Sequence, residues 1–281
     1  MTRIAGDSLA ILFRNRLAAV GFLIVAAVVL AALVGPWLVT HDPYAMNLAE
    51  RLSSPSNTHM LGTDRFGRDI FTRILLGANI AMRVAVAAVI VAFIIGVPLG
   101  AVSGYKGGWF DTLVMRFIDA LLAFPGRLLA IALVAAMGTS FFTLCVAIGV
   151  NAIPGYTRVV RAAVLVQKEK EYVEAARMAG ESEGRILFFQ ILPNCLASVL
   201  VLVTLDFAHA ILLESSLSFL GLGFAPPAPS WGLMLSEACG YMEIAPHAAI
   251  FPGLAISLTI LGFNLLGDGL RDVFDPRQYE S

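Results

Sequence analysis

Six long apolar runs alternate with shorter polar segments along the chain. The runs cover residues 17–39, 84–105, about 111–137, about 141–166, about 196–214 and 247–267. Each is long enough for the ~20 residues that a helix needs to cross ~30 Å of hydrocarbon. The third run carries Arg116, Asp119 and Arg127, and the fifth carries Asp206. The pattern predicts an all-α, polytopic membrane protein with six transmembrane helices.

The composition supports a chain embedded in a membrane. Hydrophobic residues make up 58% of the 281 positions and charged residues 14%, whereas a soluble domain is about half apolar and about a quarter charged. So few charges cannot cover a globule of this size with a water-facing surface. The net charge of −1 gives no basic excess for a nucleic-acid partner. The first run exceeds the ~7–15-residue core of a signal peptide, so we predict a retained span.

The distribution of Lys and Arg predicts the orientation. Six spans place both termini on one side, and that side would hold twelve Lys and Arg against four on the other. Because cytoplasmic loops carry an excess of these residues, we predict an N-in, C-in protein. The expected organisation is a cytoplasmic N-terminus with the first span in 1–40, a periplasmic loop in 41–79, a core with the other five spans in 80–270 and a cytoplasmic tail in 271–281.

The segment 158–190 differs from the rest of the chain because it holds eleven charges, six basic and five acidic. Good helix formers fill 167–179, and Gly180 suits the position just after a helix end. Ser182 is a suitable cap for a second helix, which we expect to run through Phe189 and to stop near Pro193. The segment therefore predicts a helix–turn–helix on the cytoplasmic side.

Two features of this hairpin favour a docking element. Its first helix gathers small side chains that let another surface come close, and its second helix is partly apolar although it lies outside the spans. The residues are Ala175, Ala176 and Ala179 on the first helix and Leu187, Phe188 and Phe189 on the second. Such a pair suits a groove on a partner, while a solvated loop is the alternative interpretation of the charge run.

Several hairpin positions match a known motif. The matching residues are Glu174, Ala175, Ala176, Gly180, Leu192 and Pro193. This pattern resembles the EAA loop of ABC importer permeases, the coupling element that inserts into the nucleotide-binding subunit. Gln190 departs from it, since that position is Ile in the general motif and often His in this branch. The resemblance implies an EAA helix–turn–helix coupling loop at about 167–193.

Further segments resemble one branch of that family, the dipeptide/oligopeptide/nickel permeases. They are LGTDRFGRD at 61–69, GYKGG at 104–108 with Asp111, Met115-Arg116 with Asp119, AFP at 123–125, ESSLSFLGLG at 214–223, the run 226–232 and FNLLGDGLRD at 263–272. The ordered set is similar to the shorter, C-type transmembrane subunit. It implies a multi-pass permease of the bacterial inner membrane that moves short peptides or a related small solute by alternating access.

No GxxxxGK[ST] phosphate loop is present in this sequence. We therefore predict that the chain is not itself an enzyme and has no cofactor of its own. The resemblance implies that partner ATPase subunits bind ATP and Mg. It further implies that a homologous second permease, two ATPase subunits and a periplasmic substrate-binding protein assemble with this chain in the membrane lipid.

Two other functions are open alternatives. A gradient-driven secondary transporter would not need the coupling hairpin and would more often show broken helices and buried ion sites. A polytopic membrane enzyme would need a convergent catalytic set, and no HExxH, GxSxG or paired Cys/His arrangement is found. The histidines show no ligand spacing, so we assign no metal site. They are His41, His59, His209 and His247.

Four charges lie in or near the predicted spans, where each would cost several kcal/mol facing lipid. They are Asp119, Arg127, Asp206 and Glu214. We interpret them as members of structural ion pairs, with direct contact to the transported solute along a pathway as the alternative.

Four more charges cluster in the first outer loop. They are Asp64, Arg65, Arg68 and Asp69. They could form a local ion network around Gly62 and Gly67, or they could contact a periplasmic binding protein. In the loop 221–246, Trp231 is interpreted as an anchor at the membrane surface, because aromatic residues favour that interface.

Overall fold

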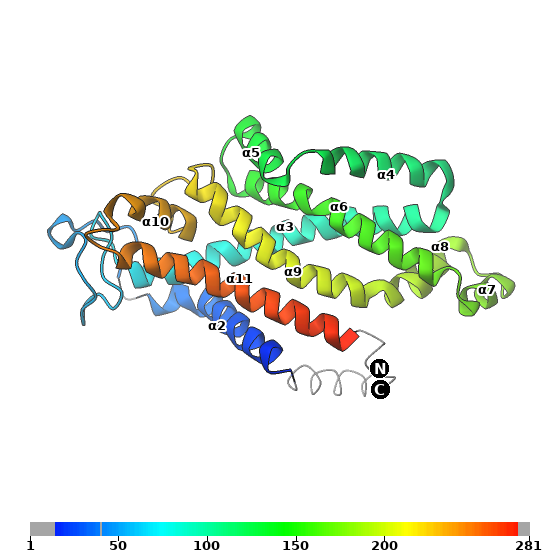
Figure 1. The fold of residues 1–281 in the computed structure, drawn as a ribbon, viewed down its shortest axis with the longest axis horizontal. Coiled ribbons are helices and arrows are strands. Elements are labelled where there is room, and N and C mark those ends of the chain that lie inside the picture. The colour runs from blue at the N-terminus through cyan, green and yellow to red at the C-terminus, as the bar shows by residue number, and fades with distance from the viewer. Residues whose placement is uncertain (1–14, 40, 275–281) are drawn as a thin grey trace.

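The computed structural model describes residues 15–39 and 41–274, and this part of the chain is helical without a β-strand (Figure 1). Residues 1–14, 40 and 275–281, which include most of the predicted N-terminal segment and tail, lie outside the described residues. The elements are α2 Arg16–Leu38, η1 Leu48–Glu50, α3 Ile70–Lys106, α4 Gly108–Ala123, α5 Gly126–Met137, α6 Phe141–Gln167, α7 Glu171–Met178, α8 Glu183–Arg185, η2 Ile186–Ile191, α9 Leu192–Phe219, α10 Trp231–Ala238, η3 Cys239–Tyr241 and α11 His247–Phe274. The predicted all-α class is confirmed.

Within the described residues, five helical segments are long and apolar enough to cross a membrane, and α4 with α5 makes a sixth if the two count as one bent span. The predicted third span, 111–137, is therefore wrong as a single helix, because α4 and α5 meet at 87°. Pro125 explains the break. A proline disfavours helical backbone at the residue before it, and Phe124 is extended, with ψ 131°.

Small residues bring α3 and α6 together in the middle of the molecule (Figure 1). Gly96, Gly100 and Gly104 lie one turn apart on α3, and a Cβ on any of them would come within 2.4 to 2.8 Å of an α6 atom. Close approach of this kind is how membrane helices associate, since lipid supplies no hydrophobic driving force between them. α3 begins at Ile70 rather than at 84, because the helix continues through Arg83, which lies 5.7 Å from the centre of the Phe141 ring, and through Arg73, which is buried.

The helices α2 and α11 pack side by side along one flank (Figure 1). Gly21 of α2 faces the α11 backbone, where a Cβ would lie 2.7 Å from the Leu266 nitrogen. At the end of this pair, Asn15 Nδ2 donates to Asp272 Oδ2 at 3.2 Å. The start of α2 and the end of α11 are thus adjacent, at the same end of the molecule as α7 and α8 (Figure 1).

The second helix of the hairpin does not stop near Pro193, contrary to the prediction. α8, η2 and α9 form one helical run of 37 residues, Glu183–Phe219. A proline ring inside an α-helix clashes with the carbonyl four residues earlier and lacks a donor. Here η2 is a π-helical turn that widens the helix just before Pro193, and Asn194 Nδ2 donates to the Gln190 carbonyl at 2.7 Å. The run therefore continues through the proline.

Candidate functional site

The hairpin turn has the geometry that its glycine predicts. Gly180 has φ +80° and follows the last residues of α7. Its N–H donates to the Arg177 carbonyl at 3.0 Å, and the Glu181 N–H donates to the Ala176 carbonyl at 3.1 Å. These two bonds form a Schellman motif, in which a left-handed residue satisfies the final carbonyls of a helix. The predicted role of Gly180 as the residue after the helix end is confirmed.

The helices beside this turn differ from the prediction in two details. The first helix begins at Glu171 rather than at 167, because Gln167 ends the long α6. Ser182 occupies the N-cap position of α8 with extended backbone, but its side chain makes no capping hydrogen bond. Its carbonyl instead accepts the Ile186 N–H at 3.0 Å. The helix–turn–helix is present, and its role in coupling stays a prediction.

The motif residues divide between an inner and an outer face. Ala176 is buried, Leu192 is half-buried, and Glu174, Ala175, Gly180 and Pro193 are exposed. One apolar cluster joins the hairpin to the neighbouring parts of α3 and α6, and its hairpin members are Val173, Ala176, Ile186, Leu187 and Ile191. Met178 and Phe189 point outward, with 90% and 77% of their surface exposed. The hairpin thus stands on an apolar base and presents two large apolar side chains beside an exposed glutamate.

A polar cluster fixes the hairpin to the end of α3. The Tyr105 hydroxyl donates to the Glu183 carboxylate and accepts from Arg177 Nη2 at 3.5 Å. Arg177 Nε also lies 3.7 Å from Glu183 Oε1. Across the turn, Gln190 Nε2 donates to Glu181 Oε2 at 2.6 Å, so the residue that departs from the motif bridges the hairpin. Tyr105 and Glu183 were missed from the sequence, although Tyr105 lies in the segment 104–108 that matched the family pattern.

The charges inside the spans follow different patterns. Asp119 of α4 pairs with Arg158 of α6 at 2.6 Å, with both side chains half exposed. Glu214 is 1% exposed, and the interpretation as an ion pair is wrong for it within the described residues. Three hydroxyls donate to it instead, from Ser218 at 2.7 Å, Ser230 at 3.0 Å and Ser215 at 3.4 Å. A buried carboxylate needs such partners, and here they tie α9 to the loop before α10.

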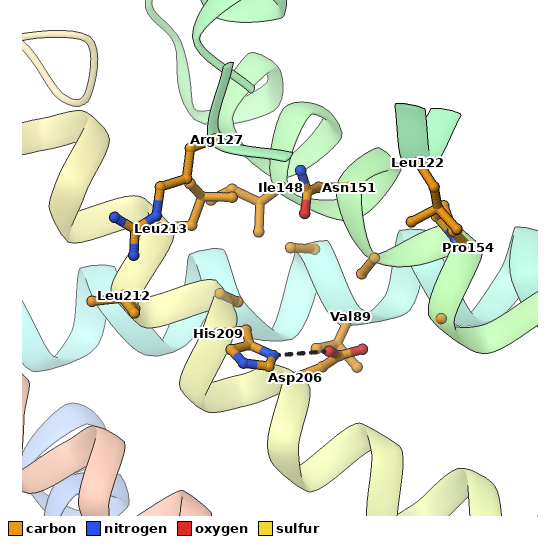
Figure 2. A pocket seen from close by; sticks show the side chains of 14 residues that line it. Val89, Leu122, Arg127, Ile148, Asn151, Pro154, Asp206, His209, Leu212 and Leu213 are labelled. Atoms are coloured by element: carbon orange, nitrogen blue, oxygen red, sulfur yellow. Dashed lines mark ion pairs between the residues drawn. The ribbon is translucent and has the colours of Figure 1, made fainter. Parts of the chain in front are cut away.

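A pocket of about 390 Å³ collects the remaining membrane charges. Figure 2 shows Arg127 of α5 on one side of it and the Asp206–His209 pair of α9 on another, with Asn151 of α6 also labelled. His209 Nδ1 lies 3.6 Å from Asp206 Oδ1. The second Asp206 oxygen, Oδ2, is buried, and the buried hydroxyl of Tyr156 interacts with this carboxylate. The structure thus brings together two of the four predicted membrane charges, Arg127 and Asp206, around one cavity.

The outer-loop charges form a buried network at the opposite end of the molecule. Arg68 is 1% exposed and lies between two carboxylates, with Nε 2.6 Å from Asp64 Oδ2 and Nη2 2.5 Å from Glu237 Oε2. Arg65 reaches Glu237 at 3.5 Å. Asp69 caps α3 by accepting the Thr72 N–H at 2.7 Å. The structure shows the local network, and contact with a binding protein stays a prediction.

His59 joins this network through Asp69. His59 Nδ1 lies 2.9 Å from Asp69 Oδ1, and Nε2 lies 3.4 Å from Glu50 Oε2. The hydrogen bond to Asp69 raises the pKa of His59 above its ordinary value, burial opposes this, and Glu50 adds to the increase. His41, His59 and Asp69 have ligand-type atoms within 4.8 Å of one another, a grouping that the linear spacing did not indicate. The contacts of His59 and Asp69 already give them structural roles.

Trp231 is not an anchor at the membrane surface, contrary to the interpretation from the sequence. It is 3% exposed at the start of α10, and its indole N–H donates to the Ile74 carbonyl of α3 at 3.0 Å. Gly77 of α3 lies beneath the ring and has no Cβ to obstruct it. The aromatic side chain therefore fastens the outer loop to the helix core rather than to lipid.

Comparison with known proteins identifies the class to which this arrangement belongs. Residues 96–279 match the family described as binding-protein-dependent transport system inner membrane component, and residues 5–55 match the N-terminal TM domain of oligopeptide transport permease C. The chain belongs to this family of ABC importer permeases, as its C-type member. It is a permease subunit of the bacterial inner membrane, and ATP is hydrolysed by separate subunits.

Relatives with assigned names cover nearly the whole chain. The dipeptide transport system permease protein DppC of Alkalihalophilus pseudofirmus is 46% identical over 264 residues, which are 94% of this chain and 87% of that protein. The glutathione transport system permease protein GsiD of Pectobacterium atrosepticum is 46% identical over 265 residues, 94% and 88% of the two chains. A chain of the inward-facing MetNI methionine ABC transporter shares the fold, with TM-score 0.59, 17% identity, and coverage of 72% and 96%.

Proposed function

We propose that this permease imports short peptides or a related small solute, and that the hairpin α7–α8 is where an ATPase subunit docks. The observation that carries the docking proposal is the exposed face of the hairpin, where Met178 lies one turn from Glu174 on α7 and Phe189 is exposed on η2. Large exposed apolar side chains on a short helical pair suit a groove on a partner. The named relatives act on dipeptide and glutathione, which supports this substrate range.

The assembly proposed around the chain has four other components. A homologous second permease completes the membrane channel, two ATPase subunits dock on the cytoplasmic hairpins, and a periplasmic binding protein delivers the solute. ATP-driven closure of the ATPases would move the hairpins, and the spans would reorient around a central path. The Tyr105–Glu183–Arg177 cluster supports this coupling, because it ties the hairpin to α3 and so links the docking face to the helix core.

The test is uptake by the complete complex in proteoliposomes, with Phe189→Ala in this chain. Removing a large side chain from the centre of an interface typically costs more than 1 kcal/mol of binding, so we expect ATPase recruitment to weaken roughly tenfold. Phe142→Ala is the matched control, because Phe142 is 68% exposed at the start of α6, away from the hairpin. Equal ATPase affinity in both variants would contradict docking here, and uptake driven by a proton gradient without ATP would contradict the import mechanism.

A further inference from the structure

The pocket of Arg127 and Asp206 lies at the middle depth of the helix bundle. Its walls include Val89 near the midpoint of α3 and Pro154 near the midpoint of α6. The bend between α4 and α5 frames one side, since Leu122 precedes it and Arg127 follows it. Leu122, Arg127 and His209 are exposed, so the pocket opens to the surface of this chain. A solute crossing the membrane through the permease has to pass this depth.

The charges in this pocket lack the partners that the other membrane charges have. Asp119 pairs with Arg158, and Glu214 is held by hydroxyls. By contrast, Arg127 makes no ion pair or hydrogen bond among the described residues, and the Asp206 carboxylate has only His209 as a basic neighbour among them, at 3.6 Å. The buried hydroxyl of Tyr156 interacts with the Asp206 carboxylate and is neutral, so it does not balance that charge. Charges at this depth are costly unless something compensates them, so the site is complete only with a polar occupant.

The pocket is suited to an occupant with two opposite charges and an apolar body. Arg127 and Asp206 come from different helices and do not pair with each other, and Figure 2 shows them on separate sides of the cavity. A guanidinium is a strong partner for a carboxylate, and a carboxylate for an ammonium group. The remaining wall is largely apolar, with Ile148, Leu212 and Leu213 among its residues. The volume of about 390 Å³ lies within the range of small-molecule sites.

We infer that this pocket is a transit site for a zwitterionic solute, with the solute carboxylate at Arg127 and its ammonium group at Asp206. This inference rests on the proposed import function and adds the chemistry that the path recognises. His209, whose Nδ1 lies 3.6 Å from Asp206 Oδ1, lines the same pocket beside this carboxylate. A free amino group and a free carboxyl group are then both required for efficient passage, independently of the binding protein.

The experiment measures ATP-dependent uptake by the complete complex for free and capped peptides. The probes are dialanine, N-acetyl-dialanine and dialanine amide, together with glutathione and N-acetyl-glutathione. For each complex we take the ratio of the uptake rate of the free peptide to that of the capped peptide. The binding protein is the same in every complex, so its own preference cancels when the variant's ratio is divided by the wild-type ratio. We expect Asp206→Asn to reduce the preference for a free amino group roughly tenfold. Arg127→Gln should reduce the preference for a free carboxyl group by a similar factor. Each factor corresponds to the loss of one charge-assisted hydrogen bond.

The two substitutions should act on opposite ends of the probe, which a structural role would not produce. Asp119→Asn is the control, since it removes a membrane carboxylate that pairs outside the pocket. If Arg127 and Asp206 instead pair with the second permease, their variants should lower assembly or slow all probes equally, and this would overturn the inference. Absence of ATP-dependent uptake of both free probes would overturn it as well.

These outcomes are distinct from failure of the proposed function. Binding-protein-stimulated ATP hydrolysis is measured in the same vesicles, and it reports coupling without reference to the pocket. Normal coupling with unchanged probe ratios would reject the transit site and leave the importer intact. Uptake that does not need ATP would reject the importer itself.

Discussion

The two polar ends of this permease use similar residues in opposite ways. At the end formed by the loop before α3, the largely buried side chain of Arg68 forms ion pairs with Asp64 and Glu237. These charges therefore stabilise the fold and are not available to a partner. At the hairpin end, Glu174 and Phe189 are exposed on an apolar base. The lesson is that a charged segment in a membrane protein has to be judged by what its charges face. The buried charge network around Arg68 stabilises the fold, whereas the exposed side chains of the hairpin are accessible to a partner.

The largest effect that separates the two ends is expected for Arg68→Ala. The substitution removes the closest cation from both carboxylates, leaving Asp64 with Arg73 at 3.7 Å and Glu237 with Arg65 at 3.5 Å. Breaking a buried ion pair in this way costs about 3–5 kcal/mol, so we expect loss of thermal stability in detergent and poor complex assembly. Arg51→Ala, an exposed position of the same loop, should change stability by no more than about 0.5 kcal/mol. An Arg68→Ala variant as stable as the wild type would contradict the structural role assigned to this charge network.

A smaller and different effect is expected for Gly180→Val in the hairpin. The backbone at φ +80° is strained for a β-branched residue, at a local cost of about 1–3 kcal/mol. Because this strain is confined to an exposed turn, assembly should persist while binding-protein-stimulated ATP hydrolysis falls. Gly184→Ala is the control, since Gly184 has open space around it and no positive φ. Normal stimulation in the valine variant would show that the angle between the two short helices does not matter.

The smallest expected effect is a pH dependence at the outer end. The pKa of His59 is raised in the folded protein, chiefly by Asp69. A raised pKa means that protonated His59 stabilises the fold below the ordinary value of about 6.5, and that this contribution is lost as the pH rises through the folded pKa. The difference in Tm between wild type and His59→Gln should therefore shrink between pH 6 and pH 8. A difference in Tm that grows with pH would contradict stabilisation of the fold by protonated His59.

The sequence predicted local features of this protein better than relations between distant segments. Gly180 was recognisable because a left-handed turn after a helix strongly favours glycine. The spans corresponding to α2, α6 and α11 were close to the observed helices, because each is a continuous apolar run. The early start of α3 was missed because two arginines interrupt the apolar pattern, and their partners lie far away in the sequence. Arg83 lies over the ring of Phe141, and Arg73 donates to the carbonyls of Pro43, Pro227 and Ala228.

The candidate site shows the same limit. Arg127 and Asp206 were picked out singly, as charges inside apolar runs, but their meeting around one cavity depends on the bend at Pro125 and on the packing of α5, α6 and α9. The partners of Glu214 were also unpredictable, since Ser230 lies sixteen residues away beyond a loop. Only the tertiary arrangement distinguishes a carboxylate held by hydroxyls, Glu214, from one that lines a cavity, Asp206.

The continuous helical run from Glu183 to Phe219 is about 56 Å long and extends from the hairpin to the loop before α10. Its near end carries the exposed hairpin aromatic, its middle carries Asp206, and Glu214 ties its far part to the outer loop through Ser230. The widened turn beside Pro193 is its one irregular point within these residues. A displacement at the hairpin end of this helix is thus transmitted to the pocket and to the loop before α10 through a single backbone.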